Sequence, residues 1–200
     1  MRIVDTMDNW NLPVTLQQFV FENVNAANKL AGPCEAVIAA IVSQARRTLQ
    51  NGGKLLFCGN GGSFALALHL AGEFVGRYAK DGPPLPAIAL GSSGAEMTAI
   101  ANDLDYREVF ARPLQALGRP RDFLIAMSTS GTSSSITHAI AIAETLDIAW
   151  SLWTSEKAPE VRARQAHEFL RAPTKDIGVA QVVHLMVGHY ICARLEEDLR

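Results

Sequence analysis

The hydrophobic and polar positions of the chain change their period after the first fifty residues. Apolar residues recur at helical spacing over residues 14–31 and again over residues 34–50. The second stretch runs into Asn51, Gly52 and Gly53, which are residue types that commonly follow the end of a helix. The pattern therefore predicts two consecutive helices at the N-terminal end of the chain.

Short apolar runs of strand length follow these helices, and they are apolar enough to be buried on both faces. Four are clear, a fifth is weaker, and a last helix is expected over about Ile177–Leu199. Because helical stretches separate the runs, the chain is expected to form a parallel sheet with helices on both faces. The predicted fold is therefore α/β, a three-layer sandwich with a five-stranded parallel sheet after an N-terminal helical extension. The expected strands are Lys54–Cys58, Pro86–Leu90, Phe123–Met127, Ile148–Trp153 and His167–Ala172.

Composition narrows the possible environments and partners. The chain has 200 residues, 48% of them hydrophobic, and this length is expected to form one domain over residues 1–200. The net charge of -2 argues against a nucleic-acid or membrane-binding surface. Neither a secretory leader nor a membrane-spanning run is expected, so the chain is predicted to be cytoplasmic. Cys34, Cys58 and Cys192 are widely spaced and are expected to be buried thiols.

A glycine-rich segment follows the first predicted strand. Gly59-Asn60-Gly61-Gly62-Ser63 can form a tight turn whose backbone N–H groups face an anion, and Ser63 is expected to cap the next helix. The segment matches neither G-x-G-x-x-G nor a Walker A motif, which argues against an NTPase. An ordinary strand-to-helix turn remains the alternative for this segment.

A second polar segment follows the third predicted strand. Residues 128–135 place seven hydroxyl side chains around Gly131, and hydroxyl and backbone N–H groups together can hold a phosphate. A solvated loop would give the same composition. Two such loops at the carboxyl ends of buried strands favour a phosphate site, because ligands of open parallel sheets bind at that edge.

Two pairs of polar side chains could hold a metal ion. His69 and Glu73 are four residues apart, so a helix presents both on one face. Gln181 and His189 are eight residues apart, about 80° around a helix axis, so both could face one cavity. These nitrogen and oxygen donors suit Zn²⁺ or a similar divalent ion. On spacing alone, a His-x3-Glu pair is more often a hydrogen bond at the surface.

Four short motifs resemble the sugar isomerase (SIS) domain, and the similarity to phosphoheptose isomerases covers nearly the whole chain. The motifs are Gly59–Ser63, Ala101–Asp103, Gly118-Arg119 and Ser128–Gly131. The resemblance implies a flavodoxin-like sheet and a cytoplasmic homotetramer in which residues 1–52 pack on the domain and within the oligomer. It also implies a place in bacterial ADP-heptose and lipopolysaccharide biosynthesis.

The resemblance further implies a set of site residues. In phosphoheptose isomerases, the residues that match His69, Glu73, Gln181 and His189 bind zinc, so one Zn²⁺ per subunit is expected. The residues that match Glu73 and His189 are also credited with proton transfer. Substrate contacts are expected from Asn60, Gly61, Gly62, Ser63, Glu73, Asn102, Asp103, Ser128, Thr129, Ser130, Ser133 and Gln181.

The implied reaction converts sedoheptulose 7-phosphate to D-glycero-D-manno-heptose 7-phosphate, or acts on a close heptose phosphate. Such an exchange of ketose and aldose moves a proton between adjacent carbons through an enediol, so it requires a base, an acid and a group that polarises the carbonyl. Glu73 could accept the proton, His189 could transfer it, and a metal would stabilise the oxyanion. Two further family matches, His184 and Arg77, are candidates for supporting roles.

Several positions depart from the family pattern. The family often has Asp where this chain has Leu66 and Gly178, and a glycine-rich loop where it has Leu152–Ala158. These changes bear on the identity of the sugar. A non-catalytic SIS scaffold of the DnaA initiator-associating type and a phosphosugar-binding sensor are therefore alternatives, although scaffolds of that type lack the residues that match Glu73 and His189.

Overall fold

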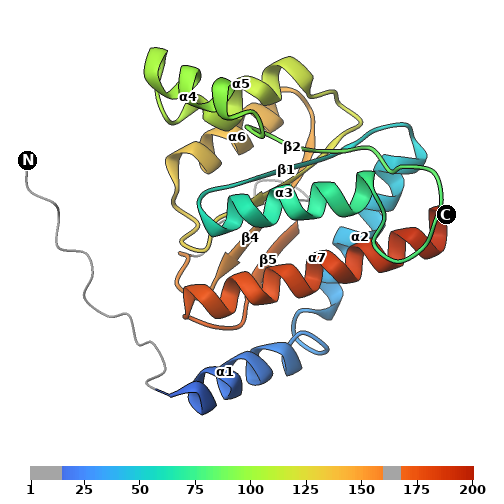
Figure 1. The fold of residues 1–200 in the computed structure, drawn as a ribbon, viewed down its shortest axis with the longest axis vertical. Helices are drawn as coiled ribbons and strands as arrows, with labels where there is room; N and C mark the ends of the chain where they lie inside the picture. The colour runs from blue at the N-terminus through green and yellow to red at the C-terminus, as the bar shows by residue number, and fades with distance from the viewer. Residues whose placement is uncertain (1–14, 160–167) are drawn as a thin grey trace, which may run out of the picture.

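A five-stranded parallel sheet lies at the centre of the computed structural model, which describes residues 15–159 and 168–200 (Figure 1). The strands lie in the order β2-β1-β3-β4-β5, and every neighbouring pair is parallel. This is the flavodoxin-like order, so the predicted fold class is confirmed. The strands are β1 Leu55–Gly59, β2 Ala87–Ala89, β3 Phe123–Met127, β4 Ala149–Ser155 and β5 Glu168–Ala172.

Helices cover both faces of the sheet, because alternate residues of each buried strand point to opposite sides. Leu55 and Phe57 of β1 pack into the cluster that includes α2, α3 and α7, whereas Leu56 and Cys58 pack into the cluster of α5 and α6. In Figure 1, α3 and α7 run side by side, and α1 lies against α7. The helices are α1 Leu16–Asn28, α2 Glu35–Gln50, α3 Gly62–Val75, α4 Gly94–Asp103, α5 Glu108–Leu117, α6 Ser134–Thr145 and α7 Ile177–Leu199.

The elements agree with the sequence patterns apart from their bounds. Both N-terminal helices form, although residue 14 of the first prediction and His167 of the fifth strand lie outside the described residues. The largest difference is at the end of α1, which lies at Asn28 rather than at residue 31. The strand β4 was predicted to end at Trp153. It continues to Ser155, because Thr154 and Ser155 are buried and pair with β5. The first part of Leu152–Ala158, the segment that stands where the family has a glycine-rich loop, therefore belongs to the strand.

The capping residue of α3 was predicted wrongly. The N-cap is Gly61, in a left-handed conformation with φ of 54°, and Ser63 lies inside the first turn, where it is buried. The turn is tight enough that a Cβ on Gly59 would lie 2.7 Å from the backbone carbonyl of Ser63. The glycines therefore allow the backbone to turn directly from β1 into α3.

The cysteines agree with the prediction of buried thiols. Cys34, Cys58 and Cys192 are all buried and unpaired, and burial raises the pKa of Cys58 and of Cys192 to about 12. Within residues 15–159 and 168–200, no helix combines the length and the apolar character needed to cross a membrane.

Candidate functional site

The two predicted anion-binding loops meet at the carboxyl edge of the sheet. They follow the neighbouring strands β1 and β3, whose next helices, α3 and α6, lie on opposite faces of the sheet. Such a point is where ligands bind in open α/β sheets. The side-chain amide of Asn60 donates a hydrogen bond to Ser135 Oγ at 3.0 Å and thereby joins the two loops.

The second loop forms a cluster of hydroxyl groups. Ser128 Oγ lies 3.1 Å from Ser133 Oγ and 3.4 Å from Ser130 Oγ, and the backbone N–H of Thr132 donates to Ser130 Oγ. The chain turns at Gly131, where φ is 68°. Among the described residues, no Lys or Arg side chain bonds to these hydroxyls, so the cluster can offer an anion neutral donors only.

Asn102 and Asp103 are less closely tied to the loops than the sequence suggests. Both are exposed at the end of α4, and the amide of Asn102 donates to Asp103 at 2.8 Å. In the described part of the chain, neither bonds to the loops after β1 and β3. Tyr106 makes that connection instead, because its hydroxyl donates to Asn60 Oδ1 at 2.8 Å. Sequence reasoning missed Tyr106, and its nearness to Asn102 in the sequence was the only available signal.

Three of the four predicted metal ligands come together between α3 and α7. One donor atom from each of His69, Glu73 and His189 lies within 4.8 Å of the others. The two histidine Nε2 atoms are 2.8 Å apart, and Glu73 Oε1 lies 3.5 Å from His69 Nε2. The helices approach closely at Gly188, where a Cβ would lie 2.5 Å from the side chain of Leu70. The missing side chain at Gly188 therefore lets α7 approach α3, which brings the neighbouring His189 within reach of α3.

This donor set fits a divalent ion. A tetrahedral zinc ion with bonds of about 2.0–2.2 Å separates its ligand atoms by about 3.3–3.6 Å, so small side-chain adjustments would suffice. Burial lowers the pKa of His189, and the neighbouring His69 lowers it further, although the Glu73 carboxylate opposes both effects. A lowered pKa favours the neutral imidazole, which is the form that binds metals.

Gln181, the fourth predicted ligand, lies apart from this cluster. An angle of about 80° around the axis does not bring the two side chains together, because eight residues separate Gln181 from His189 by about 12 Å along α7. Its side-chain amide lies against the start of α3, where a Cβ on Gly62 would be 2.6 Å from Gln181 Oε1. Gln181 and His69 nevertheless line one hollow between α3 and α7, so ligation by Gln181 stays a prediction.

Two departures from the family pattern lie in the same hollow. Leu66 and Gly178 both line it, together with Ala65, Val182 and Leu185. Where the family often has two carboxylates, this chain has an isobutyl group and a position without a side chain. The hollow beside His69 and Gln181 is therefore mainly apolar in this chain.

The two supporting candidates lie away from the cluster. His184 is fully buried, with Nε2 3.0 Å from the carbonyl oxygen of Thr154, and its ring packs on Trp153. Burial lowers the pKa of His184 to about 4, although the bond to Thr154 opposes the shift. Arg77 is exposed and pairs with Asp81 at 2.6 Å. His184 is thus a core residue.

We expect His184 to make the fold sensitive to acid. Below pH 6.5 the unfolded chain binds a proton at this residue, whereas the folded chain binds one only near pH 4. Stability should therefore fall by about 3 kcal/mol between these two pH values and then level off. Urea unfolding at pH 7 and pH 4.5 would measure this loss, which should be smaller in His184→Gln. His138→Gln, at a partly exposed site, is the control, and equal losses in all three proteins would contradict the expectation.

Comparisons with known proteins agree with the fold and identify the family. The family model described as the SIS domain matches residues 22–150. A protein named phosphoheptose isomerase from Thermodesulfovibrio yellowstonii is 38% identical over 183 residues, which cover 92% of this chain and 85% of that protein. Another, from Maridesulfovibrio salexigens, is 43% identical over 148 residues, or 74% of this chain and 72% of its own length.

Solved structures give the same result. The structure of phosphoheptose isomerase from Neisseria gonorrhoeae matches with a TM-score of 0.82 at 29% identity, and it covers 92% of this chain and 100% of its own. That of a phosphoheptose isomerase from Francisella tularensis matches with a TM-score of 0.85 at 29% identity, over 90% and 96% of the two chains. Family model, sequence relatives and folds all agree, and the chain therefore belongs to the SIS domain family and, within it, to the phosphoheptose isomerases.

Proposed function

We propose that this protein converts sedoheptulose 7-phosphate to D-glycero-D-manno-heptose 7-phosphate through an enediol. The observation that carries the proposal is the convergence of His69, Glu73 and His189 on α3 and α7. Seven residues of α3, about 10 Å, separate His69 from Gly62 in the glycine-rich loop. This span is comparable to the length of a seven-carbon sugar phosphate, whose phosphate would lie at the loops and whose carbonyl end would lie at the cluster.

The side chains have distinct roles in this proposal. Glu73 accepts the proton from the carbon next to the carbonyl, and His189 transfers a proton between the neighbouring oxygens. The loops after β1 and β3 hold the phosphate through backbone N–H groups and the hydroxyls of Ser128, Ser130 and Ser133. A zinc ion held by His69, Glu73 and His189 would polarise the carbonyl, with Gln181 as a further ligand or a substrate contact.

Removal of the metal should abolish turnover of sedoheptulose 7-phosphate. Treatment with a chelator is expected to remove one zinc per chain and to reduce the rate at least about 100-fold, since the polarising charge contributes several kcal/mol. Added Zn²⁺ should restore the rate, while Mg²⁺, which prefers oxygen ligands, should not. Formation of the aldose would be followed by chromatography of the sugar phosphates. Full activity after complete removal of zinc would refute the metal-assisted proposal.

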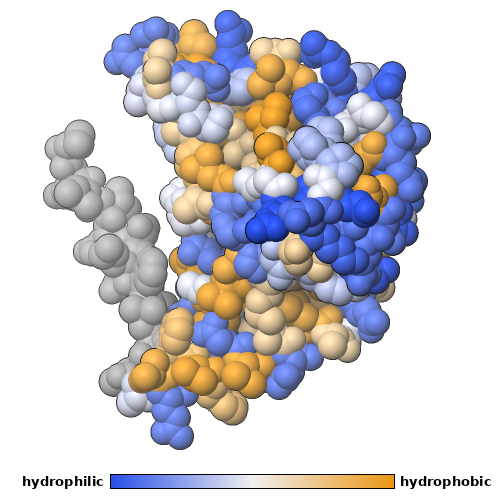
Figure 2. All heavy atoms as spheres, turned by 45° about the vertical axis from the view of Figure 1, so that its right-hand side comes forward, coloured by the Kyte–Doolittle hydropathy of each residue, from blue (hydrophilic) through white to orange (hydrophobic). Residues whose placement is uncertain are grey.

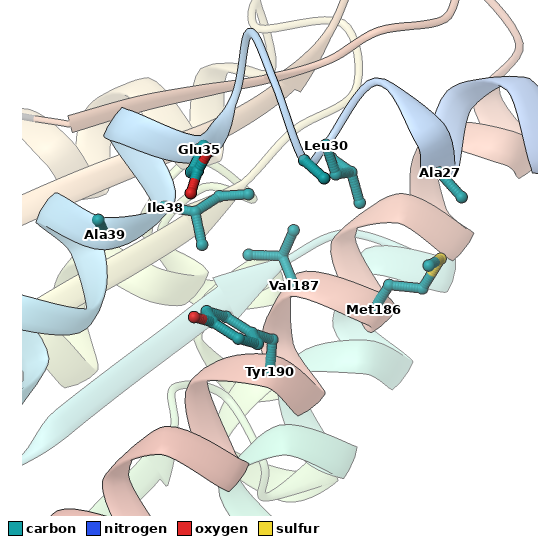
Figure 3. A pocket seen from close by; sticks show the side chains of 9 residues that line it. Ala27, Leu30, Glu35, Ile38, Ala39, Met186, Val187 and Tyr190 are labelled. Carbon is teal, nitrogen blue, oxygen red and sulfur yellow. The ribbon is translucent and has the colours of Figure 1, made fainter.

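The exposed apolar surface supports assembly with further copies of the chain, and we propose a homotetramer. Five large apolar residues of α1 are exposed, and Figure 2 shows hydrophobic atoms gathered at the lower end of the molecule, where Figure 1 places α1. Beside them, Leu30 and Ile38 face Met186, Val187 and Tyr190 of α7 across an apolar hollow (Figure 3). Monomers rarely leave so much apolar surface in water, and a second copy of the chain would cover it. The exposed residues of α1 are Leu16, Phe19, Val20, Phe21 and Val24.

The retained side chains favour an enzyme over a scaffold or sensor. A scaffold of the DnaA initiator-associating type or a phosphosugar sensor needs neither a base nor a metal, yet Glu73 and His189 are both present and are brought together. We also propose that the chain forms one domain, that the protein is cytoplasmic, and that it acts in ADP-heptose and lipopolysaccharide synthesis.

A further inference from the structure

A buried carboxylate holds the loop between α3 and β2. Glu196, near the end of α7, is 3% exposed and accepts the backbone N–H groups of Tyr78, Ala79 and Lys80 at 2.7, 2.9 and 2.8 Å. Arg200, one turn further along, donates to Glu196 Oε1 at 2.6 Å. Three consecutive N–H donors on one carboxylate fix the path of the loop directly after α3.

Arg200 holds the same loop from its carbonyl side. Its guanidinium donates to the carbonyl oxygens of Phe74 at 2.8 Å and of Gly76 and Lys80 at 3.2 Å each. Burial would raise the pKa of Glu196, but the backbone N–H donors and Arg200 outweigh this effect, so the pKa lies below the usual value of a glutamate and the pair is ionised at neutral pH. We call Glu196 and Arg200 the loop clamp.

The loop clamp places an aromatic ring against the candidate metal site. The ring of Tyr78 lies 5.1 Å from the ring of His189, at an interplanar angle of 37°. The ring of His189 also contacts His69, with ring centroids 5.1 Å apart. Among the described residues the hydroxyl of Tyr78 has no hydrogen-bond partner, so its contribution to this contact comes from the ring.

We propose that Tyr78 is a positioning residue for His189, and that the loop clamp keeps it in place. His189 is only partly buried, and without the tyrosine ring its imidazole would be free to turn to other rotamers, away from His69 and Glu73. Mutation of a group that orients a metal ligand typically lowers metal affinity or activity by about 10–100-fold. The inference rests on the proposed function, because the proposed function assigns His189 to metal binding and proton transfer.

Metal affinity tests the inference without reference to any sugar. Co²⁺ would be titrated into the metal-free protein and followed by its visible absorption, which reports the ligand geometry. Tyr78→Ala should bind Co²⁺ about 10-fold more weakly than the unaltered protein, and Tyr78→Phe should bind as tightly as the unaltered protein because it keeps the ring. Lys80→Ala is the matched control, since it changes the same loop but leaves the backbone N–H for Glu196. Glu196→Gln should resemble Tyr78→Ala if it folds.

Kinetics separate positioning from a merely structural role. With sedoheptulose 7-phosphate at saturating metal, Tyr78→Ala should lower kcat about 10-fold and leave KM nearly unchanged. Equal Co²⁺ affinity in Tyr78→Ala and the unaltered protein would overturn the inference, and so would a Tyr78→Phe variant as weak as Tyr78→Ala. If the unaltered protein binds Co²⁺ but has no turnover, the proposed function fails and Co²⁺ affinity alone decides the inference. No Co²⁺ binding by the unaltered protein would overturn the inference, while turnover of sedoheptulose 7-phosphate would still decide the proposed function.

Discussion

Glu73→Gln should lose nearly all isomerase activity while it keeps its fold. Glutamine has almost the same shape as glutamate but cannot accept a proton, so removal of the base is expected to lower kcat by about 10²–10⁴-fold. The Glu73 side chain is partly exposed, and its Oε1 lies 3.5 Å from His69 Nε2 without a closer ion pair among the described residues, so little folding stability depends on it. The rate with sedoheptulose 7-phosphate and the midpoint of thermal unfolding would be measured together.

A solvent-exchange measurement identifies the role of Glu73 more sharply. If Glu73 takes the carbon-bound proton, the unaltered enzyme should exchange that proton with D2O, and Glu73→Gln should not, even with excess zinc. Glu144→Gln is the matched control, because Glu144 is exposed on α6 at the opposite face of the sheet. Unimpaired exchange in Glu73→Gln would show that another group is the base.

The fold could be predicted from the sequence because its signals are local. The apolar runs that became β1, β3 and β4 are buried on both faces, and the helical spacing of residues 34–50 marks the face of α2 that packs on the sheet. Turn geometry was harder to predict. Ser63 is a favourable capping residue, but the positive φ at Gly61 starts α3 two residues earlier.

The site could be predicted only in part, because it depends on how two helices pack. The spacing of His69 and Glu73 defines one face of α3, but no pattern shows that Gly188 lets α7 approach it. Tyr78 reaches His189 from a loop without a regular sequence pattern, and that loop is held by Glu196, which is far away in the sequence on α7. Gln181 and His189 share a helix, and their separation along its axis matters as much as their angle.

The hollow between α3 and α7 lacks two carboxylates that the family often has there. His69 and Gln181 line it with Leu66 and Gly178, the two positions where the family often has carboxylates. Carboxylates bind sugar hydroxyls through charge-assisted hydrogen bonds, and neither Leu66 nor Gly178 can do so. The donors at His69, Glu73 and His189 are unaffected. The residues proposed to bind metal and to transfer protons are therefore different from the two positions that depart from the family pattern.

His189→Asn should also lower turnover, by at least about 100-fold, because it removes the side chain proposed both to bind the metal and to transfer a proton. The lowered pKa of His189 favours the neutral imidazole, which can accept and return a proton, whereas the amide of asparagine cannot. Zinc content should fall as well, since one of three converging donors is lost. His138→Asn is the control, because His138 lies on α6 and pairs with Glu108 at 3.0 Å, on the other face of the sheet.

The two roles of His189 can be separated by supplying zinc in excess. If His189 transfers protons, the variant should remain slow after its metal site is saturated, although exchange of the carbon-bound proton through Glu73 should partly recover. That recovery would show that His189 acts after proton abstraction, in the transfer of a proton between the two neighbouring oxygens. Full recovery of turnover with excess zinc would instead make His189 a metal ligand alone. In that case Glu73 would be the only proton-transferring side chain of the three.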